Sequence, residues 1–202
     1  MTNCLRAKIA SRKLLILGDG ACGKTSVLNV FTRGYFPETY EPTVFENYVH
    51  EISLDGKTLE LSLWDTAGQE DFDRLRSLSY SNTHVILLCF CVESRDSLEN
   101  IESKWLDEIL EYAPGVKIVL AALKCDLRED EKTLRNLAKI KEKPITYDEG
   151  LAMARRIQAA RYAECSAKCN RGVYEIFEQA ARIALTVKVS SENSTHGKCM
   201  IL

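Results

Sequence analysis

Residues 18–25 constrain this chain most, because they follow the apolar run at residues 14–17 and have the spacing GxxxxGK[ST]. Glycines at these positions let the backbone wrap around phosphates, so that its N–H groups and the N-terminus of the following helix become donors. The lysine adds a positive charge for the β- and γ-phosphates, and the threonine hydroxyl suits Mg²⁺. The sequence therefore predicts a nucleoside triphosphate site formed by Gly18, Asp19, Gly20, Ala21, Cys22, Gly23, Lys24, Thr25 and the adjacent Ser26.

Length and charge limit the class of protein. A chain of 202 residues is the size of one domain with one core. Its net charge is −2, with both signs interleaved, so we expect no nucleic-acid partner. Residues 1–13 lack the apolar centre of a signal peptide, and the longest apolar run, residues 85–92, is too short to span a bilayer.

The eight cysteines do not form a pattern typical of secreted proteins. Most lie in apolar surroundings or in the phosphate-binding loop, rather than in a short, loop-rich framework. No CxxC pair occurs, and Cys89 and Cys91 have no histidine or carboxylate at ligand spacing. We therefore expect reduced thiols in the cytosol and no zinc site.

Strand-like runs alternate with helical patterns along most of the chain, which is typical of a sheet with helices on both faces. Asp55-Gly56 is a hairpin signal between two of these runs, so one strand should be antiparallel to the others. We predict an α/β fold with a mostly parallel six-stranded sheet, one antiparallel strand and helices on both faces. The most regular strand-like runs are residues 44–54, 58–64, 85–92 and 116–122.

Helices are indicated by capping patterns and apolar stripes. Asp96 with Glu99, and Thr146 with Glu149, have the spacing of capping boxes. The first of these helices carries an apolar stripe that we assign to the core: Leu98, Ile101, Trp105, Leu106 and Ile109. The charged residues 128–143 have leucine and isoleucine at helical spacing and predict either a short surface helix that contacts partners or a solvated excursion.

The chain ends differ in composition from the middle. We expect a flexible N-terminal arm at residues 1–12, a domain at residues 13–189 with a helical insert near residues 128–143, and a flexible tail at residues 190–202.

A phosphate-binding loop alone does not separate kinases, ATPases and GTPases. Three further motifs follow predicted strands: Asp65-Thr66-Ala67-Gly68-Gln69, Leu123-Lys124-Cys125-Asp126 and Cys165-Ser166-Ala167-Lys168. In order and position, the set resembles the small GTPases. This resemblance implies a P-loop GTPase fold and GTP or GDP as the bound nucleotide.

Residues 18–25, 40–48 and 64–70 are more specifically similar to the Rho family, and the resemblance covers nearly the whole chain. Residues 128–143 then match the extra helix of Rho proteins. Residues 77–80 and 122–128 are most similar to a fungal Rho subfamily linked with polarised growth and secretion.

The resemblance implies a role for each residue that would contact the guanine base. Asp126 would accept hydrogen bonds from guanine N1–H and the 2-amino group, which adenine does not offer. Lys124 would lie along the base plane, the Ala167 N–H would meet guanine O6, and Phe36 would cover the base edge. Further nucleotide contacts are implied for Tyr40, Ser166 and Lys168.

Other residues would serve the γ-phosphate and Mg²⁺. Thr25 and Thr43 would bind Mg²⁺ through their hydroxyls, with Asp65 near the ion. Thr43 and Gly68 would also donate backbone N–H groups to the γ-phosphate. Gln69 would orient the attacking water, so we assign catalysis to Gln69, Lys24 and Thr43.

Leu123 departs from the family pattern, because small GTPases usually carry a polar asparagine or threonine there. Leucine cannot make that side-chain hydrogen bond, and an unpaired partner costs about 1–3 kcal/mol. The sequence therefore predicts weaker nucleotide retention than in a threonine-bearing relative.

The terminal Cys199-Met200-Ile201-Leu202 is a CaaX box whose leucine favours geranylgeranyl transfer to Cys199. One lipid usually gives marginal anchoring, so a second signal is needed. Our hypothesis is palmitate on Cys4, beside the basic Arg6, Lys8, Arg12 and Lys13; the alternative is an unmodified thiol. We expect the protein at the cytoplasmic face of the plasma membrane, with a cytosolic pool.

The sequence predicts a membrane switch that hydrolyses GTP slowly, because no arginine in these motifs is placed to neutralise the developing phosphate charge. The family implies GTPase-activating proteins, exchange factors, a GDP-dissociation inhibitor, and effectors in cell polarity, actin signalling or secretion. One alternative is a docking module with negligible hydrolysis, whose usual mark is a replaced Gln69 or Gly20, and neither is replaced. Another is an ATP-dependent kinase or ATPase, which Asp126 disfavours.

Overall fold

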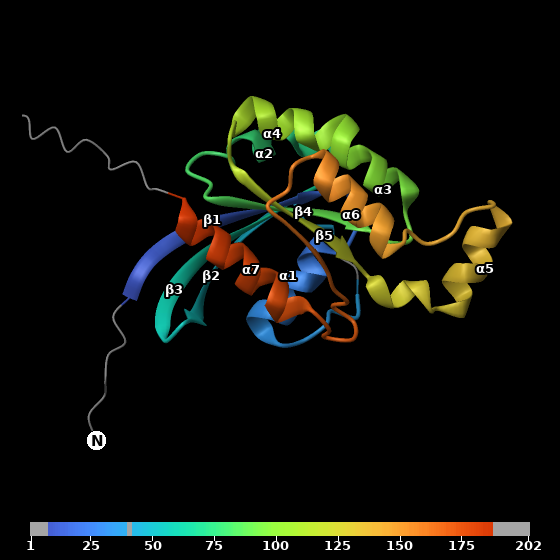
Figure 1. Ribbon diagram of the computed structural model, residues 1–202, viewed down its shortest axis with the longest axis horizontal. Helices are drawn as coiled ribbons and strands as arrows, with labels where there is room; N and C mark the ends of the chain where they lie inside the picture. The colour runs from blue at the N-terminus through green and yellow to red at the C-terminus, as the bar shows by residue number, and fades with distance from the viewer. Residues whose placement is uncertain (1–7, 40–41, 188–202) are drawn as a thin grey trace, which may run out of the picture.

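A computed structural model describes residues 8–39 and 42–187 of the chain. One sheet has the strand order β2-β3-β1-β4-β5-β6 (Figure 1). Strand β2 is antiparallel to β3, and every other pairing is parallel, which confirms the predicted α/β fold. The strands are β1 (Lys8–Gly18), β2 (Phe45–Leu54), β3 (Lys57–Thr66), β4 (Val85–Cys91), β5 (Lys117–Leu123) and β6 (Arg161–Glu164).

The sheet separates two apolar cores. Helices α1 (Lys24–Arg33) and α7 (Val173–Thr186) pack on one face. On the other face lie a continuous helical segment and α6 (Tyr147–Arg156). That segment comprises α3 (Arg95–Asn100), the π-helical turn η2 (Ile101–Trp105) and α4 (Leu106–Tyr112). Strands β4 and β5 are almost wholly buried because both of their faces are covered, which explains their nearly continuous apolar sequence.

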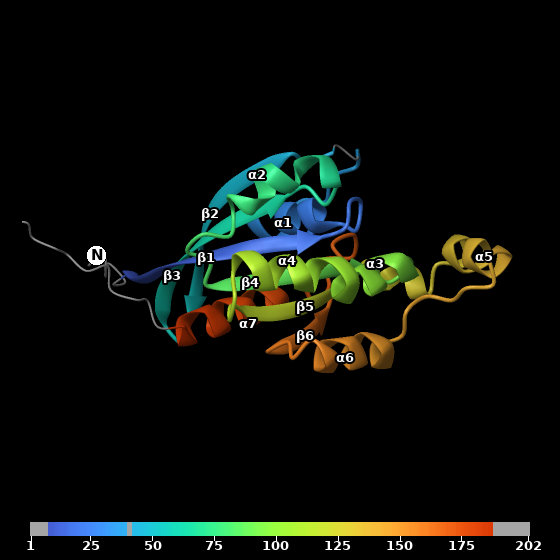
Figure 2. The ribbon, with the colours of Figure 1, turned by 90° about the horizontal axis from the view of Figure 1, so that it is seen from above.

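The insert contains a helix, as its leucine spacing predicted. Helix α5 (Glu131–Lys139) begins after Asp130, whose carboxylate accepts the Thr133 N–H at 2.8 Å. Leu137 is buried, whereas Leu134 and Ile140 remain exposed. Figures 1 and 2 show α5 standing apart from the helices that cover the sheet.

One domain boundary predicted from the sequence is wrong. Strand β1 begins at Lys8, within the predicted arm at residues 1–12, because this segment pairs with β3 from Thr58 onward. Arg12, assigned to a free basic arm, instead donates from Nε to the Ala184 carbonyl at 3.0 Å. Lys13 lies over the Trp64 ring, with its Nζ 3.4 Å from the centroid. The Arg12 and Lys13 side chains are therefore held against the domain and do not belong to a free arm.

The cap of α3 also differs from the prediction. Ser94 accepts the Ser97 N–H at 3.2 Å and caps the helix, whereas Asp96 lies in its first turn. A serine two residues earlier satisfies the cap, so Asp96 contributes only its charge near the positive helix end. The Thr146–Glu149 capping box of α6 is confirmed. Among the described residues, no helix is long and apolar enough to cross a membrane.

Candidate nucleotide site

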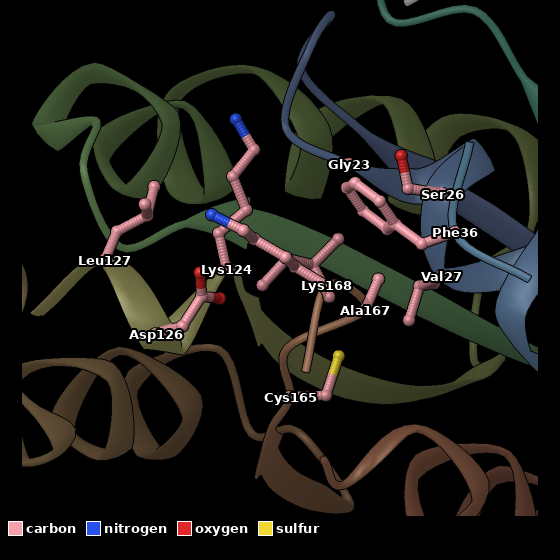
Figure 3. A pocket seen from close by; sticks show the side chains of 11 residues that line it. Gly23, Ser26, Val27, Phe36, Lys124, Asp126, Leu127, Cys165, Ala167 and Lys168 are labelled. Carbon is pink, nitrogen blue, oxygen red and sulfur yellow. The ribbon is translucent and has the colours of Figure 1, made fainter. Parts of the chain in front are cut away.

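The predicted motifs meet at one edge of the sheet. The P-loop (residues 18–25) follows β1, the segment at residues 65–69 ends β3, and residues 123–126 end β5. These three strands are parallel, so their carboxyl ends lie together, where α/β folds bind ligands. A cleft of about 590 Å³ runs between the P-loop, residues 35–39 with residues 42–43, and residues 66–69. A smaller cavity of about 110 Å³ adjoins it (Figure 3).

The conformation of the P-loop requires glycine at Gly18. This residue has φ +137°, and a Cβ there would lie 2.1 Å from the Cys89 carbonyl oxygen. The Lys24 side chain is only 5% exposed, and its Nζ donates to the carbonyls of Gly18 and Asp19 at 2.7 and 2.8 Å. Helix α1 begins at Lys24 without a side-chain cap. Its first N–H groups and the ammonium therefore form a positive end suited to phosphate.

Three oxygen-bearing side chains from separate segments converge beside the P-loop. The Thr25 hydroxyl donates to Asp65 Oδ2 at 2.6 Å and lies 2.5 Å from the Thr43 hydroxyl. Asp65 is fully buried, and within the described chain its Oδ1 has no hydrogen-bond partner. Burial raises the pKa of this carboxyl to about 6, against the opposing effects of the Thr25 hydrogen bond and the Lys24 charge. A carboxylate and two hydroxyls in this arrangement suit a hard divalent cation.

Gly68 and Gln69 lie directly against the P-loop. A Cβ on Gly68 would be 2.3 Å from the Gly20 nitrogen, so only glycine permits this approach. The Gln69 side chain lies beside Gly20, where an added Cβ would be 3.4 Å from Gln69 Cδ. The structure thus brings the predicted γ-phosphate and water-orienting residues together.

The smaller cavity has the predicted base-recognition residues around it. Asp126, Ala167 and Lys168 line it with Phe36, and Figure 3 shows these side chains around a common space. Asp126 Oδ1 is buried and has no hydrogen-bond partner in the described residues, so an acceptor remains for a base. Further lining residues are Gly23, Ser26, Val27, Leu123, Lys124, Leu127 and Cys165.

Lys124 adopts the left-handed conformation with φ +58°, which is uncommon outside glycine. Its Nζ pairs with Glu93 Oε1 at 2.9 Å, so the aliphatic stem lines the cavity while the charge is bound at one side. Such a local departure from regular backbone is typical of functional sites.

Two assigned side chains face away from the nucleotide cavities. Ser166 is fully buried, does not line either cavity, and accepts the Cys169 N–H on its hydroxyl at 3.0 Å. The Asp19 carboxylate accepts from Asn100 Nδ2 at 2.8 Å and from Trp105 Nε1 at 2.7 Å, behind the P-loop. Both side chains therefore shape the loops. Tyr40, Cys4 and Cys199 lie outside the described residues.

Sequence reasoning missed the residues that hold the base-recognition loops together. Arg128 forms two hydrogen bonds to the Glu164 carboxylate, at 2.5 and 2.7 Å, and another from Nε to the Ile145 carbonyl. The short helix η3 (Cys125–Arg128) is thereby tied to the end of β6. The only available signal was an arginine two residues after Asp126, which does not by itself identify a partner.

This fold, with its convergent P-loop, Asp65 and Asp126 motifs, is that of a P-loop GTPase. The Ras family model matches residues 13–186. GTP-binding protein rho3 of Schizosaccharomyces pombe is 60% identical, with 93% of this chain and 91% of the relative covered. GTP-binding protein RHO3 of Saccharomyces cerevisiae is 55% identical (96% and 95% covered), and Rho-related GTP-binding protein RhoB of Homo sapiens is 56% identical (95% and 97% covered).

The chain belongs to the Rho family of small GTPases, with similarity to fungal Rho proteins. It is accordingly a GTP-binding switch that binds GTP and GDP and hydrolyses GTP. Regulators and effectors in general follow from this family membership.

Proposed function

We propose that this GTPase is a Mg²⁺-dependent membrane switch in signalling to the actin cytoskeleton, cell polarity or secretion. The observation that carries this proposal is the meeting of Thr43, Gly68 and Gln69 at the P-loop, since these residues come from two separate segments. A γ-phosphate bound there would hold both segments, and its loss would release them together. Regulators and effectors would read residues 40–48 and 68–78, whose conformation then depends on the nucleotide.

In this proposal Thr25 and Thr43 bind Mg²⁺, with the buried Asp65 carboxylate beside them. The ion neutralises phosphate charge when it is bound. Lys24 and the N-terminus of α1 hold the phosphates, and Gln69 orients water for attack. Asp65 Oδ1 has no hydrogen-bond partner in the part of the chain that the structure describes, and this supports the assignment, because a buried carboxylate oxygen needs a partner.

The guanine base would occupy the 110 Å³ cavity. Asp126 would accept from N1–H and the 2-amino group, the Ala167 N–H would meet O6, and Lys124 and Phe36 would cover the ring. Asp126 Oδ1, which has no partner within residues 8–39 and 42–187, supports this choice of base. ATP is disfavoured because adenine would leave that carboxylate without donors.

For membrane attachment we propose geranylgeranyl on Cys199 and palmitate on Cys4, which would place the protein on the cytoplasmic face of the plasma membrane with a cytosolic pool. Arg12 and Lys13 are engaged by the domain, so acylation rather than basic charge would supply the second signal. Cell fractionation of a Cys4→Ser variant tests this idea. A fall in the membrane-bound share supports palmitate, whereas an unchanged share, with prenylation intact by mass spectrometry, leaves Cys4 an unmodified thiol.

The central experiment is single-turnover loss of γ-phosphate from GTP preloaded on the purified protein, with and without a Rho-type GTPase-activating domain. Related proteins hydrolyse GTP at about 10⁻⁴ s⁻¹ alone and about 10⁵-fold faster with a partner arginine. We expect slow release that the domain accelerates. Tight binding without stimulated release would favour a docking module, and release from ATP in the control reaction would overturn the role of Asp126.

A further inference from the structure

Arg76, which no motif singled out, is almost completely buried at 1% exposure. Its guanidinium forms a bidentate pair with Glu108 of α4, from Nε at 2.7 Å and from one terminal nitrogen at 2.6 Å. The other terminal nitrogen donates to the carbonyls of Ala67 and Gln69, at 3.1 and 3.3 Å. Arg76 therefore holds the backbone on both sides of Gly68.

The helical segment that packs against Arg76, at η2, also contacts the P-loop. The Trp105 ring lies 4.8 Å from the Arg76 guanidinium carbon, within cation–π range. The indole N–H of Trp105 donates to Asp19 of the P-loop, and Lys104 Nζ donates to the Gly68 carbonyl at 3.4 Å. Lys104 and Trp105 belong to η2, a π-helical turn, and such turns occur frequently at functional sites.

Tyr80 completes the cluster. Its hydroxyl donates to Glu108 Oε1 at 2.8 Å, so this carboxylate is bound from two directions and is itself only 14% exposed. A buried arginine is tolerated only when its charge and donors are satisfied. Here two of its hydrogen bonds satisfy the carbonyls of Ala67 and Gln69, on either side of Gly68, where positioning matters for the reaction.

We infer that Arg76 is a positioning residue for GTP hydrolysis. Through Glu108 and Trp105 it fixes the carbonyls of Ala67 and Gln69 against the helix that also fixes Asp19, so Gln69 keeps its position relative to the P-loop. This inference rests on the proposed role of Gln69 in orienting water. Small displacements of positioned groups cost hydrolysis much more than they cost nucleotide binding.

The test compares Arg76→Lys and Glu108→Gln with the unmodified protein. Lysine keeps the charge but lacks the planar fork, and glutamine keeps the shape but loses the carboxylate. We expect each variant to lower single-turnover hydrolysis about tenfold, with and without a GTPase-activating domain, while the GDP dissociation rate changes less than about twofold. The matched control is Arg182→Lys. Arg182 pairs with two carboxylates, Asp55 and Glu178, as Arg76 pairs with Glu108 and Asp73, but the Arg182 side chain is exposed.

A double variant separates positioning from a general loss of stability. If Arg76 acts through Gln69, adding Arg76→Lys to Gln69→Leu should lower the residual hydrolysis rate no further. An equal loss in both backgrounds, or parallel acceleration of GDP release and loss of hydrolysis, would show that Arg76 only stabilises the fold. If Arg76→Lys and Glu108→Gln hydrolyse GTP normally while Gln69→Leu is impaired, the inference about Arg76 is wrong and the proposed role of Gln69 stands. Normal hydrolysis by Gln69→Leu would instead overturn the proposed role of Gln69.

Discussion

Leu123 is the residue at which this chain departs from other small GTPases, and the structure gives its replacement a measurable consequence. Its side chain is 2% exposed at the end of β5 and lines the 110 Å³ cavity. An added Cβ on Gly23 would lie 3.8 Å from Leu123 Cδ1, so the leucine packs directly beneath the P-loop. We therefore expect Leu123→Thr to place a hydroxyl where the apolar Leu123 side chain now lies against the P-loop.

This substitution should have two opposite effects: it lowers the stability of the fold and strengthens the retention of nucleotide. Removing buried carbon costs about 0.8 kcal/mol for each methylene, so the free energy of unfolding should fall by about 1–2 kcal/mol. One new neutral hydrogen bond between the hydroxyl and the loop contributes about 0.5–1.5 kcal/mol. Since 1.4 kcal/mol is a factor of ten, GDP dissociation should slow by about 2- to 12-fold even though the fold is less stable.

The assay is release of a fluorescent GDP analogue into excess unlabelled GTP at fixed Mg²⁺ concentration. Leu123→Val is the matched control, because valine has the shape of threonine without the hydroxyl. We expect the threonine variant to release the analogue more slowly than both the valine variant and the unmodified protein. Equal rates for the threonine and valine variants would refute the reasoning, because the hydroxyl would then have no effect on retention.

Three further substitutions test the proposed site. Gln69→Leu should keep the protein in its GTP form, and a normal rate of stimulated phosphate release would contradict this. Thr25→Asn should weaken Mg²⁺ and favour the nucleotide-poor state, because it removes the hydroxyl that joins Asp65 and Thr43; an unchanged Mg²⁺ titration of nucleotide exchange would exclude that role. Asp126→Asn should lower GTP affinity at least about 100-fold, since two hydrogen bonds to a charged group contribute about 1.5–3 kcal/mol each. Competition with xanthosine triphosphate, whose C2 carbonyl can accept from the new amide, provides the readout.

Features set by local periodicity or by contiguous motifs could be predicted from the sequence. The hairpin at Asp55-Gly56 is one example, because both residues adopt the positive φ that its turn requires. The edge of the sheet that carries the site was also predictable, because parallel strands place the ends of β1, β3 and β5 together. Local signals therefore determined where the predicted nucleotide residues would meet.

Which side chains hold that edge in place was not predictable, because each depends on a partner far away in sequence. Trp105 fitted an apolar helical stripe, and its burial confirms that reading. The stripe could not reveal that the indole N–H reaches Asp19, 86 positions away. Arg76 likewise belonged to no motif, and its burial depends on Glu108, which lies opposite it and 32 positions away in the sequence. Hydrophobic periodicity indicates which face of a helix is buried, whereas the single polar atom on that face can determine which loop the helix holds.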